Sequence, residues 1–123
     1  MLLRNGTVVS GTGCVRQDIR IGGGRIVQTG PGLEPLEEEE VMDVSGCLVA
    51  PGGIDAHTHF DMPCGGIMTS DDFESGTRAA VAGGTTTVID FSEPEQGASL
   101  QSGLDRWHEK ADGRSFTDYS FHM

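Results

Sequence analysis

Two histidines one residue apart, His57 and His59, are the residues whose type and spacing best fit a chemical role. They end the run Pro51–His59, in which Pro-Gly-Gly introduces a strand pattern. Alternate side chains of a strand point to the same face, so both imidazoles can reach one metal ion at about 2.0–2.1 Å. Asp55 shares this face, and Asp61 does so if the strand extends that far. The spacing predicts that His57 and His59 bind a divalent metal, although H-x-H pairs also occur by chance.

Three other side chains near these elements keep alternative roles. His108 stands in the polar helical stretch Arg106–Lys110 and is predicted to face solvent. His122 comes at the end of a predicted strand, where a structural role is favoured over one that points inward. Asp90 lies near the end of another strand, so it either faces the histidines or is buried beside helix termini.

From Pro51 onward, strand patterns alternate with helix patterns, which is typical of βαβ units and a parallel sheet. A predicted strand, Ile54–Phe60, carries the histidines at its carboxyl end, where α/β barrels build their active sites. The other predicted elements are a helix capped by Ser70–Asp72 and ended by Gly83-Gly84, a strand Thr85–Phe91 buried on both faces, a helix capped by Ser99 or Ser102 that ends near Gly113, and a strand Phe116–His122. Three parallel strands close no barrel, so we expect the chain to be the front of a longer protein.

The first fifty residues carry no helix pattern and predict a meander of short antiparallel strands. Asn5-Gly6 is a two-residue hairpin signal between Leu2–Arg4 and Thr7–Val9. Cys14–Ile21 alternates apolar and polar residues, which predicts one further strand before a glycine turn. The sequence therefore predicts an α/β protein with a β-rich part, residues 1–50, and a βαβαβ part, residues 51–123.

Composition and charge exclude several classes of function. A net charge of −11 argues against nucleic acid, because phosphate binding needs a basic surface. Much of this charge lies in Glu34 and Glu37–Glu40, which predict a solvated loop. No stretch approaches the roughly 20 apolar residues of a membrane-spanning helix, and the start lacks the apolar core of a signal peptide, so we expect a cytoplasmic protein. The scattered cysteines predict free thiols, with Cys14 and Cys47 as small apolar fillers.

Several runs of the sequence, in order along the whole chain, carry a resemblance to a known family. They are Leu3–Val9, Pro51–Pro63, Asp71–Thr77 and Gly83–Phe91, and Trp107 and Asp118–His122 fit as well. On these runs the chain resembles the N-terminal quarter of the dihydropyrimidinases and D-hydantoinases. These enzymes are the cyclic amidohydrolase branch of the metal-dependent amidohydrolases.

The resemblance implies that residues 51–123 begin a (β/α)₈ TIM barrel and that residues 1–50 supply strands of a small β-sandwich domain. It implies hydrolysis of the cyclic amide bond of small molecules, 5,6-dihydropyrimidines or 5-substituted hydantoins. Such enzymes use two Zn²⁺ ions to generate the nucleophile and polarise the carbonyl. His57 and His59 match the first two ligands, which sit on one metal. The family's enzymes are usually tetramers, so a homotetramer is expected of the full-length protein.

The family's other ligands, a carboxylated lysine, two histidines and an aspartate, have no match here. Lys110 is the only lysine and does not match the family's bridging position. We therefore expect the 123-residue chain alone to be inactive. Dihydroorotases and many allantoinases place an arginine after the histidines for acidic substrates, and its absence favours an uncharged ring. Met62, Cys64 and Ile67 lie in the segment that lines the pocket in hydantoinases, although packing roles stay equally open.

Two other interpretations remain. A non-catalytic scaffold or short form could associate with a full-length subunit through exposed strand edges. Retention of both histidines favours the enzyme lineage over the related scaffold proteins. The third interpretation is a free-standing metal-binding β-rich domain.

Overall fold

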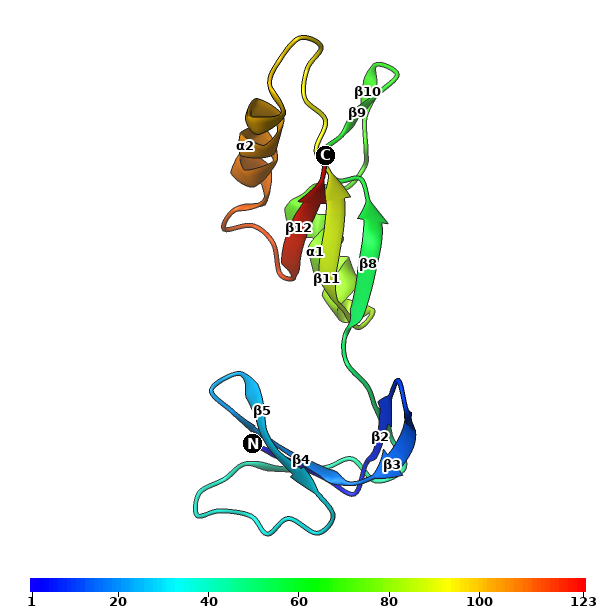
Figure 1. Cartoon of the computed structure of the whole chain (residues 1–123), viewed down its shortest axis with the longest axis vertical. Coiled ribbons are helices and arrows are strands. Elements are labelled where there is room, and N and C mark those ends of the chain that lie inside the picture. The colour runs from blue at the N-terminus through cyan, green and yellow to red at the C-terminus, as the bar shows by residue number, and fades with distance from the viewer. The chain divides into compact units, whose positions relative to one another are not determined.

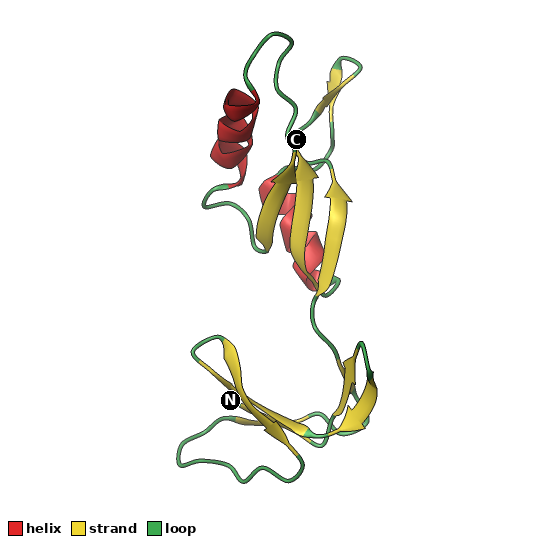
Figure 2. Cartoon of the chain, viewed as in Figure 1, coloured by secondary structure: helices red, strands yellow, loops and turns green.

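The computed structural model describes all 123 residues, which form two compact units, Met1–Pro51 and Gly52–Met123. Figure 1 labels the elements, and Figure 2 shows that both helices belong to the second unit. The first unit contains β1 (Leu2–Arg4), β2 (Thr7–Ser10), β3 (Gly13–Arg16), β4 (Asp18–Gly22), β5 (Arg25–Gly30), β6 (Val41–Asp43) and β7 (Leu48–Val49). The second contains β8 (Gly53–Thr58), β9 (Pro63–Cys64), β10 (Ile67–Met68), α1 (Phe73–Ala82), β11 (Thr85–Phe91), α2 (Leu100–Ala111) and β12 (Asp118–His122). The fold is therefore mixed α/β, and neither helix has the length and apolar content to span a membrane.

The first unit consists of two sheets, with strand orders β5-β4-β1-β6 and β3-β2-β7. The predicted hairpin at Asn5-Gly6 is wrong, because β1 and β2 belong to different sheets. A two-residue hairpin turn of the Asn-Gly type needs positive φ at both central residues, whereas here only Asn5 has one, at 67°. Gly6 provides space instead, since a Cβ there would lie 2.8 Å from Cγ2 of Val49. The Asn-Gly pair thus leads the chain from one sheet to the other.

The predicted antiparallel meander is wrong in part. β1 pairs with β6 and β2 with β7 in parallel, while the hairpins β2–β3 and β4–β5 are antiparallel. The predicted strand Cys14–Ile21 is broken at Gln17, whose N–H donates to the carbonyl oxygen of Gly6 at 3.2 Å. Cys14 and Cys47 are exposed free thiols and not buried fillers.

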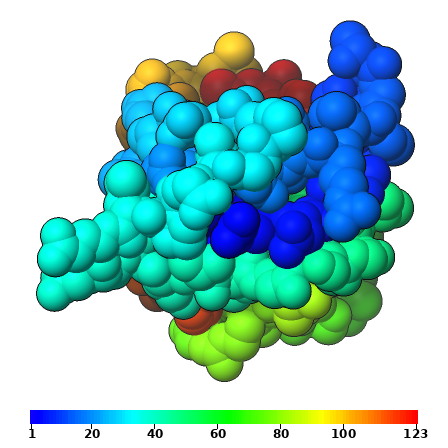
Figure 3. Space-filling model, turned by 90° about the horizontal axis from the view of Figure 1, so that it is seen from below, coloured from blue at the N-terminus to red at the C-terminus, as the bar shows by residue number.

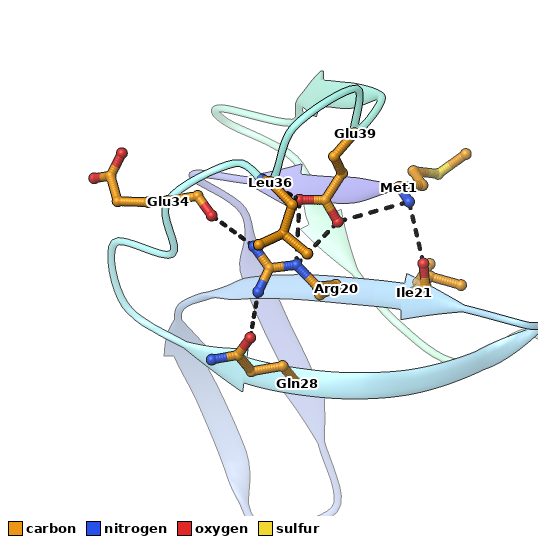
Figure 4. A network of polar contacts seen from close by, with 7 residues as sticks. All are labelled: Met1, Arg20, Ile21, Gln28, Glu34, Leu36 and Glu39. Carbon is orange, nitrogen blue, oxygen red and sulfur yellow. Dashed lines mark hydrogen bonds and ion pairs between the residues drawn. The ribbon is translucent and has the colours of Figure 1, made fainter.

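The acidic loop of the first unit is only partly solvated. Four of its carboxylates are exposed, as predicted, and Figure 3 shows the segment around them in cyan: Glu34, Glu37, Glu38 and Glu40. Glu39 differs, because only 7% of its side chain is exposed and it accepts from Nε of Arg20 at 2.9 Å (Figure 4). Arg20 also donates to the carbonyl oxygen of Glu34 at 2.6 Å, so its guanidinium holds the loop against β4. The hydrogen bond from Arg20 keeps the pKa of Glu39 below its ordinary value.

The second unit is built on a parallel sheet of order β12-β11-β8, and its helices form where the capping residues predict them. Asp72 caps α1, since its side chain accepts from the Ser75 N–H at 2.7 Å. In turn, the Ser75 hydroxyl oxygen accepts from the Asp72 N–H, which completes a capping box. Ser99, the first of the two predicted serines, caps α2. Local sequence signals therefore fix both helix starts.

One face of this sheet packs against both helices. Its core comprises Phe73 from α1 with Trp107 and Ala111 from α2, and Phe60, Tyr119 and Phe121 pack against them. The expectation that β11 is buried on both faces is wrong for this chain. Only Val88 and Asp90 are buried, whereas the side chains on the opposite face are half-buried, because no layer of the second unit covers that face.

A short hairpin, β9–β10, follows the histidines, in a segment for which the sequence analysis predicts no strand. Gly65 and Gly66 turn the chain with φ of 57° and 88°, the positive values that such a two-residue turn requires. Cys64 and Ile67 flank this turn and are exposed. The hairpin thus presents both side chains to solvent.

Candidate metal centre

The two histidines lie at the carboxyl end of β8, at the edge of the sheet where all three parallel strands end. His57 belongs to the strand, and His59 is the first residue after it. Their Nε2 atoms approach to 3.2 Å, and the ring planes are nearly perpendicular, at 83°. Strand alternation therefore brings both imidazoles to one face, as their spacing indicates.

The separation of these nitrogens fits two ligands of one tetrahedral ion. Two atoms at about 2.0–2.1 Å from such an ion lie roughly 3.3–3.4 Å apart, close to the observed distance. The same distance lets one neutral ring donate an N–H to the other when no ion is bound. No group of three or more His, Cys, Asp or Glu side chains comes close enough to hold a metal. This chain therefore offers two ligands and no more.

A phenylalanine that the sequence analysis did not single out supports both histidines. The ring of Phe91, at the end of β11, lies 4.5 Å from the His57 ring and 5.2 Å from the His59 ring, measured between centroids. The ring of His122 also packs against Phe91, with centroids 4.7 Å apart. Its Nε2 donates to the carbonyl oxygen of Ala56 at 3.0 Å. His122 thus lies on the histidine face, but a backbone oxygen already occupies its Nε2. Strand parity from Val88 and Asp90 would have placed Phe91 on this face.

Asp90, left open between two roles, is fully buried on the helix-facing side. Its Oδ2 accepts from the Thr58 hydroxyl at 2.9 Å and from the Phe60 N–H at 2.8 Å. Its Oδ1 accepts from the indole Nε1–H of Trp107 at 2.9 Å. The register of β8 on β11 pairs Asp90 with Thr58, which explains this orientation. Asp90 therefore lies behind the histidines and does not face them.

Phe60 follows the second histidine and anchors it to helix α1. Its ring packs edge-on against Phe73, with centroids 5.3 Å apart. Gly76 of α1 makes room for this ring, since a Cβ there would lie 2.2 Å from Cε1 of Phe60. Glycine inside a helix costs about 1 kcal/mol relative to alanine, so its presence here needs such a packing reason.

The flanking aspartates do not join the histidines. Asp55 turns back to the strand, where Oδ1 accepts the His57 N–H at 3.2 Å. Asp61 does not extend the histidine face, because β8 ends at Thr58 and Asp61 takes a positive φ of 51°. Its carbonyl oxygen accepts from Nζ of Lys110 at 2.5 Å. Burial lowers the pKa of Lys110, whose ammonium also lies 4.1 Å from the Trp107 ring centroid.

One ring nitrogen of the histidine pair is left without a partner. Nδ1 of His59 is buried and has no hydrogen-bond partner in this chain. Metal-ligating histidines usually donate this second N–H to a carboxylate or carbonyl, and Asp90 is already engaged by three donors. His108 is exposed, as predicted, and lies 3.3 Å from Asp112. It takes no part in the candidate centre.

Comparison with known proteins decides the family. The sequence profile described as "Amidohydrolase family" matches residues 48–113, which is more than half of the chain and includes both histidines. The chain belongs to the amidohydrolase family. Among amidohydrolases it is 49% identical to the D-hydantoinase of Geobacillus stearothermophilus over 122 residues, which cover 99% of this chain and 26% of that protein. It is 45% identical to dihydropyrimidinase 2 of Caenorhabditis elegans over 123 residues, 100% of this chain and 24% of that protein.

Solved structures of amidohydrolases agree. The crystal structure of the dihydropyrimidinase from Brevibacillus agri NCHU1002 superposes with a TM-score of 0.94 at 47% identity, over 98% of this chain and 26% of that one. The resemblance to the N-terminal part of dihydropyrimidinases and D-hydantoinases is thereby confirmed. This amidohydrolase chain spans about a quarter of the length of the relatives it matches.

Proposed function

We propose that this chain is the N-terminal part of a zinc-dependent cyclic amidohydrolase that opens the ring of 5,6-dihydropyrimidines or hydantoins. The observation that carries the proposal is the 3.2 Å approach of Nε2 of His57 to Nε2 of His59 at the carboxyl end of a parallel strand. The relatives named as D-hydantoinase and dihydropyrimidinase support the substrate class. The absence of a basic side chain directly after the histidines favours an uncharged ring.

In this proposal His57 and His59 would hold one of two zinc ions of the complete site. Zinc, when bound, supplies a Lewis acid that polarises the amide carbonyl and activates the attacking water. The residues of this chain bind and orient. Phe91 packs against both imidazoles and places an apolar ring beside them. The remaining ligands, and every catalytic residue, would come from parts of the full-length protein outside these 123 residues.

The proposal extends to the architecture. Strands β8, β11 and β12 with α1 and α2 would be the first units of a (β/α)₈ barrel, residues 51–123. The strands of residues 1–50 would form part of a small β-sandwich domain. The full-length protein would be a cytoplasmic homotetramer. The structure of the full-length protein tests the barrel and the β-sandwich, and its molecular mass in solution tests the homotetramer.

Metal binding by the 123-residue chain is the direct test. Zinc titration followed by NMR of the imidazole side chains should shift the signals of His57 and His59 together. His57→Ala and His59→Ala should each weaken binding at least roughly tenfold, because one of two ligands is lost. His108→Ala is the matched control, since this exposed histidine lies outside the centre. Zinc-induced shifts that survive both histidine substitutions would contradict the proposed site.

The open edge of β8 favours a second candidate function. β8 pairs only with β11, and its residues from Gly53 to His57 are exposed, so its outer edge can accept another strand. A short form of this kind would associate with a full-length subunit without catalysing the reaction. Co-purification with the full-length protein supports this role, whereas a monodisperse chain that captures no such partner excludes it. Turnover of dihydrouracil or hydantoin by the isolated chain would overturn the expected inactivity.

A further inference from the structure

We propose that Asp90 is a positioning residue that fixes the orientation of His59. The inference concerns the buried side of the sheet, opposite the two imidazoles. Its consequence for metal affinity rests on the proposed metal site, whereas its consequence for the His59 ring does not.

Two contacts of Asp90 lie on either side of His59 in the sequence. Oδ2 of Asp90 accepts from the Thr58 hydroxyl at 2.9 Å and from the Phe60 N–H at 2.8 Å. These two residues immediately precede and follow His59, so one carboxylate oxygen holds the Thr58 side chain before it and the Phe60 backbone after it. Regular strand structure ends at Thr58, and beyond that point no ladder bond does this work. The Asp90 side chain therefore replaces the missing strand partner.

The three donors around Asp90 make its carboxylate hard to replace. Asp90 is fully buried and has no cation among its partners, which are one hydroxyl, one amide and one indole N–H. An ionised carboxylate is acceptor-only and can satisfy three donors at once. An amide at this position has one acceptor oxygen, and its NH₂ group would meet one of the donors. Buried donors left unpaired are costly, so the site selects aspartate.

His57 provides an internal reference for this role. Its backbone N–H is held by Asp55 and not by Asp90. Loss of the Asp90 contacts should therefore loosen the ring of His59 and leave that of His57 in place. A merely structural role in the core would loosen both rings together.

The test uses the metal-free 123-residue chain first. NOEs between the rings of His59 and Phe91, whose centroids are 5.2 Å apart, should be present in the native chain. They should weaken in Asp90→Asn and in Thr58→Val, while NOEs between His57 and Phe91 persist. Thr77→Val is the matched control, because it removes another buried hydroxyl, far from the histidines in sequence. This hydroxyl accepts from the Phe116 N–H and donates to the Phe73 carbonyl oxygen. In Thr77→Val all ring NOEs should stay unchanged.

Asp90→Asn combined with Trp107→Phe separates positioning from stability. Phenylalanine removes the indole N–H, so the asparagine oxygen can accept from Thr58 and Phe60 while its NH₂ group meets no donor. The double variant should regain the His59–Phe91 NOEs of the native chain although it is less stable than the native chain. If Asp90→Asn does not fold, Thr58→Val and this double variant still decide the question.

Zinc affinity gives the second readout. Thr58→Val and Asp90→Asn should weaken zinc binding roughly 10- to 100-fold, the usual loss for residues that orient a metal ligand, and Thr77→Val should not. Unchanged His59 NOEs in both Asp90→Asn and Thr58→Val overturn the positioning role. A native chain that shows the NOE pattern but binds no zinc at its histidines overturns the proposed metal site and leaves the positioning role supported.

Discussion

Each unit of the chain contains one buried aspartate that joins segments far apart in sequence, and the surroundings of the two differ. Asp18 in the first unit accepts the backbone N–H groups of Asn5 and Leu33, both at 2.8 Å. Asp90 in the second unit accepts from a hydroxyl, an amide and an indole. Asp90 lies beside an aromatic core, whereas in the first unit the buried apolar side chains are only Leu2 and Ile19.

The difference shows how each unit specifies its structure. Apolar side chains of the first unit line an open groove of about 410 Å³ instead of a closed core; among them are Leu3, Val8, Ile19, Ile21, Ile26 and Val49. Its loops are therefore held by polar contacts, such as those of Asp18 and of the Arg20–Glu39 pair. The second unit has a core formed by its own residues, and its buried aspartate adds orientation to packing that already exists.

Trp107→Ala should have the largest effect and should act on the second unit. Removal of a buried aromatic side chain costs about 3–5 kcal/mol, and here it also deprives Oδ1 of Asp90 of its donor. Urea unfolding followed by amide NMR should show loss of the signals of residues 52–123 at lower urea. Amide signals of Asp18 and its partners should keep their native midpoint. A simultaneous loss of both sets would show that the two units do not unfold separately.

Asp90→Ala and Asp18→Ala compare the two carboxylates directly. Asp90→Ala leaves three donors without their acceptor, and each buried donor left unpaired costs about 1–3 kcal/mol. Asp18→Ala leaves two backbone N–H groups. The fall in urea midpoint should therefore be larger for Asp90→Ala in the second unit than for Asp18→Ala in the first. The opposite order would show that the aromatic core compensates for lost polar contacts.

Acid should destabilise the first unit more than the second. Three of its carboxylates have a lowered pKa: Asp18 from backbone N–H bonds, Glu39 from the Arg20 guanidinium and Asp43 from the Ser45 hydroxyl. The second unit has two, at Asp72 and Asp112. A pKa lowered by folding means that the ionised carboxylate stabilises the folded state. This stabilisation is present above the ordinary values of 3.8 and 4.5 and is lost as pH falls through the lower folded values.

Amide NMR spectra recorded at falling pH check this difference between the units. Signals of residues 1–51 should disappear at a higher pH than those of residues 52–123. Glu39→Gln serves as the control, because a side chain that is neutral at every pH should flatten the pH dependence of the first unit. An unaltered pH profile in Glu39→Gln would assign the acid sensitivity to other groups.

The smallest effect is expected for Arg78→Gln, and Arg20→Gln is the comparison. Arg78→Gln breaks an ion pair with Glu74 on the surface of α1, where both side chains are more than half exposed. Such i,i+4 pairs contribute roughly 0.3–0.5 kcal/mol, so the melting temperature should hardly change. Arg20→Gln should lower it clearly, since the Arg20 side chain is 11% exposed and holds the acidic loop. Equal effects would mean that Arg20 contributes no more than a surface pair.

The second unit follows its sequence more closely than the first because its signals are local. Asp72, Ser99 and Gly83 each act within a few residues, and the helix limits predicted from them agree with the structure. Strand pairing in the first unit depends on distant partners. Asn5-Gly6 has the composition of a hairpin turn, but the Asn5 N–H is taken by Asp18, thirteen residues away in sequence. No pattern within a short window contains that information.

The same distinction holds at the candidate centre. Period-two alternation along β8 is local, so it places His57 and His59 together without knowledge of the rest of the fold. The surroundings of the pair come from other elements. Phe91 and Asp90 reach the two sides of the sheet from β11, and the register between β8 and β11 sets which residues of β8 they lie against. Sequence reasoning therefore identified the histidine pair but not its support.

The contact between Phe60 and Gly76 has a consequence for how the family can vary. The ring occupies the space that any side chain at position 76 would need. A relative that acquires a larger residue at position 76 must therefore also replace the aromatic ring at position 60 with something smaller. Aligned sequences of many relatives should show these two positions changing as a pair. Deep mutational scanning should likewise find position 76 intolerant of substitution unless position 60 changes with it.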